Sequence, residues 1–293
     1  MNYTIEVMRL IAVVLITFTH TRHTLESGPL YILLEEVPKY GTLLLSIISG
    51  FLFWAKSRAE PNLFEKKVKS LALPYLTANG LVLGLTLLIY WIWGYNYLNR
   101  LPLDYHLITE GLFSLNGAPI DPPTYFIRDI FIVFVMMDIL FNKRYKLILV
   151  LLPFLIFGKL MLRFDILGLF ALGMLFAAKF KQWGWHSFQL VFLLLSIAAI
   201  RWLPEYSKFA VSPLLFCIFI SFKIPFRKTG GFTYLLHLYH SPIIVMTYPL
   251  LSQIIPNMIV CIFTQIAVAL FFAGMLYLLS ERWRFLKFLS GGR

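Results

Sequence analysis

The feature that most constrains this chain is a series of apolar runs, several of which approach twenty residues without interruption. A helix needs about 17 to 25 mostly apolar residues to cross the hydrocarbon core of a bilayer. Hydrophobic residues make up 59% of the 293 residues and charged residues only 14%, so the chain has too little polar surface to cover a soluble fold. The sequence therefore predicts an all-α, polytopic integral membrane bundle that forms a single domain over residues 1–293.

We expect about ten transmembrane helices, some of them short. The expected spans cover residues 3–22, 40–55, 71–93, 125–141, 147–162, 164–178, 187–203, 207–222, 232–251 and 258–279. The first apolar run has neither a basic segment before it nor a small-residue cleavage site, so we expect a mature helix rather than a signal peptide.

The placement of Lys and Arg predicts the orientation, because cytoplasmic loops retain these residues. With the N-terminus inside, 17 of the 26 basic residues fall in cytoplasmic segments and seven in outer segments. Both termini are therefore expected in the cytoplasm, in agreement with an even number of spans. The same bias accounts for most of the net charge of +12, so we expect no nucleic-acid partner.

Three ionisable residues, Glu6, Arg9 and His20, lie in the first expected span. Each costs roughly 2.5 to 3.5 kcal/mol on membrane-insertion scales, which makes it a candidate functional residue. Arg9 and His20 are eleven positions apart, which at about 100° per residue places them on one helix face, roughly 16 Å apart along the axis. A Glu6–Arg9 pair that only neutralises the arginine, with a histidine at the outer interface, explains the same pattern.

Six short segments together resemble the acyltransferase 3 family. They are the Glu-x-x-Arg and later His at 6–20, Ser-Gly-Phe at 49–51, a basic run at 66–69 before Pro-Tyr at 74–75, Tyr-Phe-Ile-Arg at 125–128, Gly-Met-Leu at 173–175 and Tyr-Leu-Leu-His at 234–237. The likeness runs from residue 3 to about residue 242. Two departures stand out: the basic run uses Lys where the family is Arg-rich, and the fourth span lacks the family's Trp-Ser-Leu-x-x-Glu form, for which neither Asp129 nor Glu110 is an obvious substitute.

This resemblance implies a multi-pass O-acyltransferase, usually an O-acetyltransferase, in the inner (cytoplasmic) membrane of a bacterium. The implied reaction moves an acyl group from cytoplasmic acetyl-CoA to a hydroxyl of a surface polysaccharide or lipid-linked glycan. Acyl-CoA is then a co-substrate, no cofactor is bound permanently, and the partners are acyl-CoA, the saccharide acceptor and membrane lipid, with homo-oligomerisation left open. His20 acts as general base or briefly carries the acyl group, with Arg9 and Glu6 in the same catalytic group.

Basic residues between the second and third spans are expected to bind the phosphates of CoA, because they place cations beside the membrane on the side where CoA is found. They are Arg58, Lys66, Lys67 and Lys69. The lysines serve equally well as topology signals alone.

Arg128, Asp129 and His237 are candidate acceptor-binding residues. The first two fit an interfacial anchoring pair as well as a binding role. The polar loop at 95–124 is expected to cover the acceptor site, with a plain solvent loop as the alternative.

We expect no metal site. His237 and His240 are three positions apart, but a metal needs further ligands at the same depth, and no acidic residue lies in their span. Cys217 and Cys261 fall inside apolar spans, where free Cys behaves as a small hydrophobic residue, so they predict neither a disulfide framework nor a metal cluster.

Two other functional classes remain open at this point. A transporter or flippase for a small anion or a lipid-linked glycan would use the charged stripe as a permeation path; it should show inverted repeats, and none is evident, although Pro153, Pro242 and Pro249 allow broken helices. A haem-bearing redox protein would need paired histidines, for which only His20 and His237 qualify. An absorption spectrum tests the haem alternative.

Overall fold

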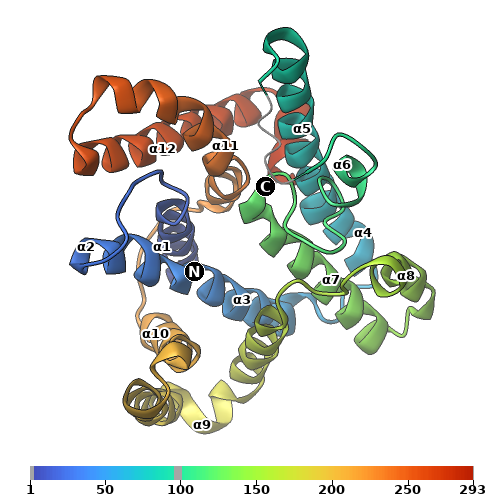
Figure 1. The fold of residues 1–293 in the computed structure, drawn as a ribbon. Helices are drawn as coiled ribbons and strands as arrows, with labels where there is room; N and C mark the ends of the chain where they lie inside the picture. Colours follow the sequence, from blue (N-terminus) through green and yellow to red (C-terminus); the bar gives the residue numbers. More distant parts are fainter. Residues whose placement is uncertain (1–2, 96–100, 293) are drawn as a thin grey trace. The chain divides into compact units, whose positions relative to one another are not determined.

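The helical elements account for most of the chain. The structure is a computed structural model that describes residues 3–95 and 101–292, and it contains no strand within these ranges. The longer helices are α1 (Thr4–Phe18), α3 (Tyr40–Leu52), α5 (Leu73–Trp93), α7 (Tyr125–Asn142), α8 (Ile148–Phe157), α9 (Phe164–Trp202), α10 (Lys208–Ser221), α11 (Gly230–Ile254) and α12 (Met258–Arg282) (Figure 1). Shorter helical elements are α2 (Pro29–Tyr31), η1 (Ile32–Glu36), η2 (Val37–Lys39), η3 (Phe53–Ser57), α4 (Leu63–Lys67), η4 (Val68–Ala72), α6 (His106–Thr109), η5 (Pro122–Thr124), η6 (Tyr145–Leu147), η7 (Pro204–Tyr206) and η8 (Arg284–Ser290). The all-α prediction is confirmed for the described residues.

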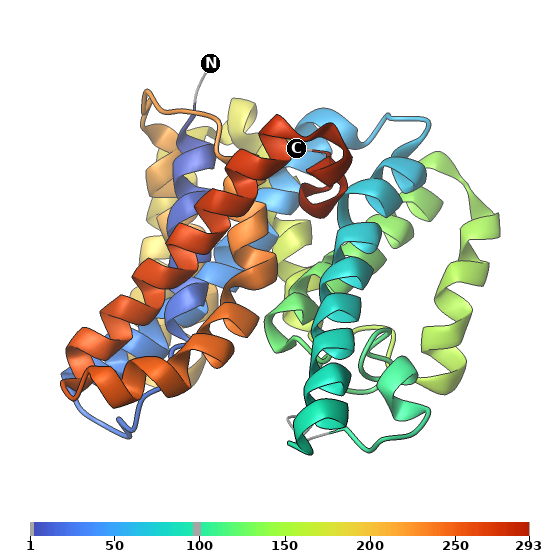
Figure 2. The ribbon, with the colours of Figure 1, turned by 90° about the horizontal axis from the view of Figure 1, so that it is seen from above.

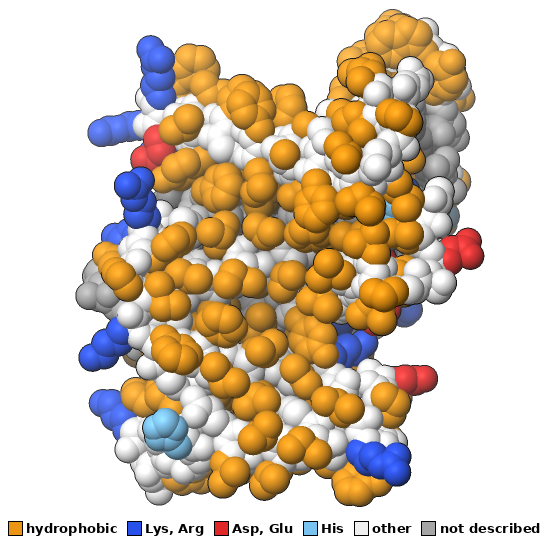
Figure 3. Space-filling view, turned by 90° about the vertical axis from the view of Figure 1, so that its left-hand side faces the viewer, with side chains coloured by type: hydrophobic (Ala, Val, Ile, Leu, Met, Phe, Trp, Pro, Cys, Tyr) orange, Lys and Arg blue, Asp and Glu red, His pale blue; other side chains and the backbone are white. Residues whose placement is uncertain are grey.

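Every expected span contains helix. Within the described residues, four helical stretches are long and apolar enough to cross a membrane: Pro29–Ser57, Leu63–Trp93, Phe164–Trp202 and Met258–Arg282. Hydrophobic side chains also cover most of the surface seen in Figure 3. These are the properties of a membrane protein. The number of ten spans and the cytoplasmic termini stay predictions.

The structure shows where α9 and α8 break or end. The expected sixth and seventh spans follow each other in α9 as two helices that meet at a kink, where the backbone of Gly184 leaves helical geometry with a φ of 73°. The expected fifth span ended at residue 162, but α8 ends at Phe157. The next residue, Gly158, is extended and packs so closely on the Leu115 carbonyl that a Cβ there would overlap it. The loop before α7 therefore ends α8. The sequence of α8 alone contains no signal for this end.

The chain divides into two compact units, which are described separately. Unit 1 is Met1–Thr19, Leu25–Ala59 and Phe164–Thr233, and unit 2 is His20–Thr24, Glu60–Arg163 and Tyr234–Arg293.

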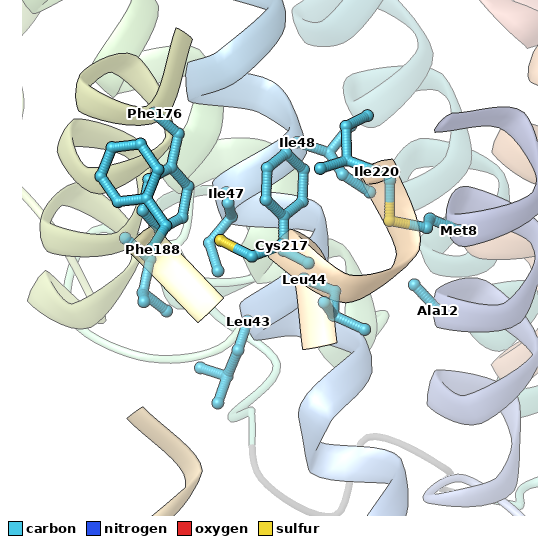
Figure 4. Packing of buried hydrophobic residues seen from close by; sticks show 12 residues of the cluster. Met8, Ala12, Leu43, Leu44, Ile47, Ile48, Phe176, Phe188, Cys217 and Ile220 are labelled. Atoms are coloured by element: carbon cyan, nitrogen blue, oxygen red, sulfur yellow. The ribbon is translucent and has the colours of Figure 1, made fainter. Parts of the chain in front are cut away.

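In unit 1, helices α1, α3, α9 and α10 share one apolar core. It contains Met8, Ala12, Leu43, Leu44, Ile47, Ile48, Leu169, Phe176, Phe188, Phe216, Cys217 and Ile220. Figure 4 shows side chains of this cluster directed towards one another from the four helices. The rings of Phe176 and Phe216 are stacked, with centroids 5.6 Å apart and planes at 8°. The aromatic residues therefore fill the space between α9 and α10.

Glycines set the distance between α3 and α9. A Cβ on Gly50 would overlap the Phe170 carbonyl, and a Cβ on Gly173 would overlap the Ile47 carbonyl. Only glycine allows two helix backbones to approach this closely. These two glycines belong to the Ser-Gly-Phe and Gly-Met-Leu segments of the sequence, so both segments have a packing role in this fold.

In unit 2, α4 and η4 pack against α7, and η8 folds back onto α5 and α12. Figures 1 and 2 both show α11 and α12 running side by side as a hairpin. Near the C-terminus, Gly291 has a φ of +67°, a value that suits glycine. A Cβ on this residue would overlap the backbone of Ser70, so the C-terminal segment packs closely on Ser70.

Candidate functional site

His20 lies in the turn after α1, not on the helix. The helix ends at Phe18, where the hydroxyls of Thr17 and Thr19 donate hydrogen bonds to the carbonyls of Val13 and Ile16. Threonine side chains that bond the preceding turn in this way are common where a helix weakens or stops. The helical spacing that placed Arg9 and His20 on one face therefore does not extend to His20, and the expected end of the first span at residue 22 is wrong.

Gln265 of α12 holds the segment that carries His20. Its Oε1 accepts a hydrogen bond from the Arg22 N–H at 2.8 Å, and its Nε2 donates to the Arg22 carbonyl at 3.1 Å. Gln265 is fully buried. One buried amide thus satisfies both backbone groups of a residue two positions from His20.

We expect Gln265→Leu to lower the thermal unfolding temperature, because it leaves both backbone groups of Arg22 without their side-chain partner. Each polar group that loses its bond in a buried place costs about 1–3 kcal/mol. Thermal unfolding of the purified protein in detergent measures the change. Thr264→Val is the matched control, since Thr264 is only half-buried and bonds only within α12. Equal unfolding temperatures for the two variants would show that Gln265 does not anchor the segment.

Three histidine rings lie close together in unit 2, one from this segment and two from α11. The ring of His20 lies 5.2 Å from that of His240, centroid to centroid, and the ring of His240 lies 6.2 Å from that of His237. His237 also makes an edge contact with Phe126 of α7 at 5.7 Å. His240 is fully buried and His237 is 4% exposed, whereas His20 is partly exposed. We call these three residues the histidine cluster.

The hydrogen bonding of His240 fixes the state of its ring. Nδ1 lies 2.8 Å from the Leu236 carbonyl oxygen, which can only accept, so Nδ1 carries the hydrogen. In the neutral ring Nε2 is then a bare acceptor, and it is buried without a hydrogen-bond partner among the described residues. The sequence pointed to His20 and His237 as candidates and treated His240 only as a metal ligand that we did not expect. The structure brings all three together.

A second polar group of unit 2 precedes α7. The side chain of Asn79 on α5 accepts from the Asp121 N–H at 3.1 Å and donates to the Thr124 hydroxyl at 3.0 Å. Thr124 in turn donates to the Asp121 carbonyl at 2.7 Å. All three residues are buried. None of the sequence patterns above predicted this group, although an Asn inside an apolar span is a signal that could have led to it.

In unit 1, Arg9 and Glu6 form the expected ion pair, with Nη1 of Arg9 3.0 Å from Oε1 of Glu6. Oε2 of Glu6 accepts a hydrogen bond from the Thr229 N–H at 3.1 Å. Thr4 also holds the preceding connection, by donating to the Phe222 carbonyl at 2.6 Å. Glu6 therefore joins α1 to the start of α11 as well as pairing with Arg9.

Several basic residues of the expected donor site already interact with other side chains of the protein. Lys66 forms an ion pair with Glu60 at 2.9 Å, and the Lys67 ammonium lies 3.7 Å above the ring of Phe134. Lys66 and Lys69 are exposed. These residues belong to unit 2, whereas Arg58 belongs to unit 1, where it lies 4.3 Å above the ring of Trp54. Within unit 2, Lys66 and Lys69 are therefore the exposed members of this basic group.

Arg128 and Asp129 hold the connection between α8 and α9. Their buried ion pair is 2.6 Å long, and Arg128 also donates to the Leu160 carbonyl at 2.9 Å. Asp129 accepts from the backbone N–H groups of Leu162 and Arg163 at 3.2 and 2.9 Å. Most of their hydrogen-bonding capacity is therefore used by the chain itself, and a role of Arg128 and Asp129 in acceptor binding stays a prediction.

The described part of the loop at 95–124, residues 101–124, is organised around Glu110. Its carboxylate accepts hydrogen bonds from the backbone N–H groups of Asn116 and Gly117 at 2.8 and 3.0 Å. Burial acts to raise the pKa of Glu110, but these bonds outweigh it and the pKa is lowered on balance. The Leu115 carbonyl accepts from the Lys159 N–H at 2.7 Å, which fixes the loop to the end of α8. A role as a lid stays a prediction.

Among the described residues, no group of three or more His, Cys, Asp or Glu side chains could hold a metal ion. Comparisons with protein families, with curated protein sequences and with solved structures find no match for this chain.

Proposed function

We propose that the chain is a membrane O-acyltransferase that moves an acetyl group from cytoplasmic acetyl-CoA to a hydroxyl of a surface polysaccharide or lipid-linked glycan. The observation that carries the proposal is the histidine cluster, in which His240 keeps a buried Nε2 lone pair. A neutral imidazole with such a lone pair can take the proton of a hydroxyl. The six sequence segments that resemble the acyltransferase 3 family support the same chemistry.

In the proposed reaction, the acceptor hydroxyl oxygen attacks the thioester carbonyl carbon and the carbon–sulfur bond breaks. An imidazole of the histidine cluster takes the hydroxyl proton and then gives it to the departing thiolate, so that an ester and free CoA result. His20 is the proposed base, because it is the partly exposed member of the cluster and can meet a substrate. Alternatively, His20 carries the acetyl group between donor and acceptor. Arg9, neutralised by Glu6, is the proposed positioning residue of unit 1.

Membranes that contain the chain provide the direct assay. Radiolabelled acetyl-CoA is added, and label is measured in the extracted glycan and glycolipid. The proposal requires incorporation that depends on the chain.

We expect the triple variant Lys66→Gln, Lys67→Gln, Lys69→Gln to raise the KM for acyl-CoA several-fold. These cations are proposed to attract the CoA phosphates, and exposed charges are screened over about 10 Å at 0.1 M salt, so the effect should grow as the salt concentration falls. Label incorporation at varied acetyl-CoA concentrations and two ionic strengths measures it.

The matched control replaces three other lysines of the expected cytoplasmic side, Lys143, Lys146 and Lys179, by Gln. It removes the same charge from other places. An unchanged donor KM in the correctly inserted first variant would leave Lys66, Lys67 and Lys69 as topology signals only.

A further inference from the structure

Asp121 is a buried carboxyl group that the reaction above does not use. It is 2% exposed, and neither carboxylate oxygen makes a hydrogen bond of normal geometry with the described residues. The hydroxyl of Ser241 on α11 lies beside it. Buried polar groups are nearly always hydrogen-bonded, so a carboxyl group in this state indicates a place where another polar molecule binds.

The backbone of Asp121 is held firmly although its side chain is not. Asn79 binds its N–H and Thr124 binds its carbonyl, and Asn79 is itself fixed by donating to the Tyr75 carbonyl at 2.9 Å. Two elements of unit 2, α5 and η5, thus position a side chain whose carboxylate oxygens make no hydrogen bond of normal geometry with the described residues. A buried polar group that lacks hydrogen bonds lowers stability, and such positions are typically functional.

The surroundings of Asp121 favour its uncharged form. Among the described residues no Lys or Arg forms an ion pair with it, and an ionised carboxylate without a partner is costly in a buried place. Burial raises the pKa of Asp121, which lies in the segment before α7, to about 8. The carboxyl group therefore keeps its proton at neutral pH.

A protonated carboxyl group is both a donor and an acceptor, as is the Ser241 hydroxyl. A saccharide hydroxyl is also both, so it can satisfy the two groups together. Neither group carries positive charge, so an anionic ligand would be left without compensation. Ser241 lies on the same turn of α11 as His237 and His240, which belong to the histidine cluster.

We propose that Asp121 and Ser241 form the subsite that binds a neutral hydroxyl of the saccharide acceptor, beside the histidine cluster. This inference rests on the proposed acyl transfer and names the residues that select its acceptor. Asp121 acts by hydrogen bonding to the acceptor. Asparagine also donates and accepts hydrogen bonds, so Asp121→Asn should keep this function.

The test measures label transfer from radiolabelled acetyl-CoA to glycan in membranes that contain each variant. We expect Asp121→Ala to transfer about tenfold more slowly with an unchanged KM for acetyl-CoA, and Asp121→Asn to stay within about threefold of the unmodified chain. Asp104→Asn, in the exposed part of the same loop, is the control and should have no effect. A wild-type rate for Asp121→Ala overturns the proposal. So does an Asp121→Asn variant as slow as Asp121→Ala, because the ionised carboxylate would then be needed.

Thermal unfolding of each variant shows whether the fold survives. If Asp121→Ala does not fold, Ser241→Ala decides, since it removes the other half of the subsite: a severalfold slower transfer supports the proposal and a wild-type rate overturns it. If the unmodified chain transfers no label at all, the acyltransferase function itself is contradicted, and the subsite is rejected with it.

Discussion

His20→Ala is expected to reduce acyl transfer by about 10²- to 10⁴-fold, the usual effect of removing a general acid or base. His20 is the partly exposed member of the histidine cluster, and its ring lies 5.2 Å from that of His240. Its removal should leave insertion and folding intact, because Gln265 holds the segment through the backbone of Arg22. Label transfer from acetyl-CoA, compared at equal amounts of folded protein, measures the loss.

His23 supplies the matched control for this experiment. It lies three residues further along the same segment of unit 2 and is buried to a similar degree. His23→Ala should retain most of the transfer activity. If His23→Ala removes activity and His20→Ala does not, the proposed alignment with acyltransferases fails at its centre, and a transport function becomes the better explanation.

Gly173→Val should prevent unit 1 from packing. A side chain at this position would overlap the Ile47 carbonyl, so α3 and α9 would have to separate along the core that they share. Overpacking a close interior commonly costs 1–3 kcal/mol, and a clash with backbone, which cannot change rotamer, should reach or exceed the upper end of about 3 kcal/mol. We expect little monodisperse protein in detergent, and a clearly lower unfolding temperature for what remains.

The control is Gly168→Val on the same helix, where an added Cβ meets no atom within 4 Å. Both substitutions have the same helix propensity, so their difference isolates the contact between α3 and α9. Similar stability of the two variants would contradict the close approach of these helices.

Continuous apolar runs predicted the helices well, because hydrophobic length is a property of each segment alone. The ends of helices were less accessible. The end of α8 depends on Leu115, a residue of another segment, and the end of α1 lies where two threonine hydroxyls bond carbonyls of the last two helical turns. Such bounds follow from contacts or competing hydrogen bonds, which hydropathy does not report.

For the candidate site, the sequence identified His20 and His237 from the cost of ionisable residues in a membrane and from the family resemblance. His240 could be recognised only from the structure. Its Nδ1 is bonded to the Leu236 carbonyl, and its buried Nε2 has no hydrogen-bond partner among the described residues. Asp121 was inconspicuous among the polar residues of its loop. Its backbone is held by Asn79, a distant residue in the chain, so periodicity could not reveal this position.

The central claim is that this chain acylates a glycan, and mass spectrometry of surface glycans from cells with and without the gene tests it most directly. The account predicts a glycan species heavier by one acetyl group in cells that carry the gene, absent from cells without it and from cells that carry only His20→Ala. Identical glycan spectra from all three kinds of cell, with the protein present in the membrane, would contradict it.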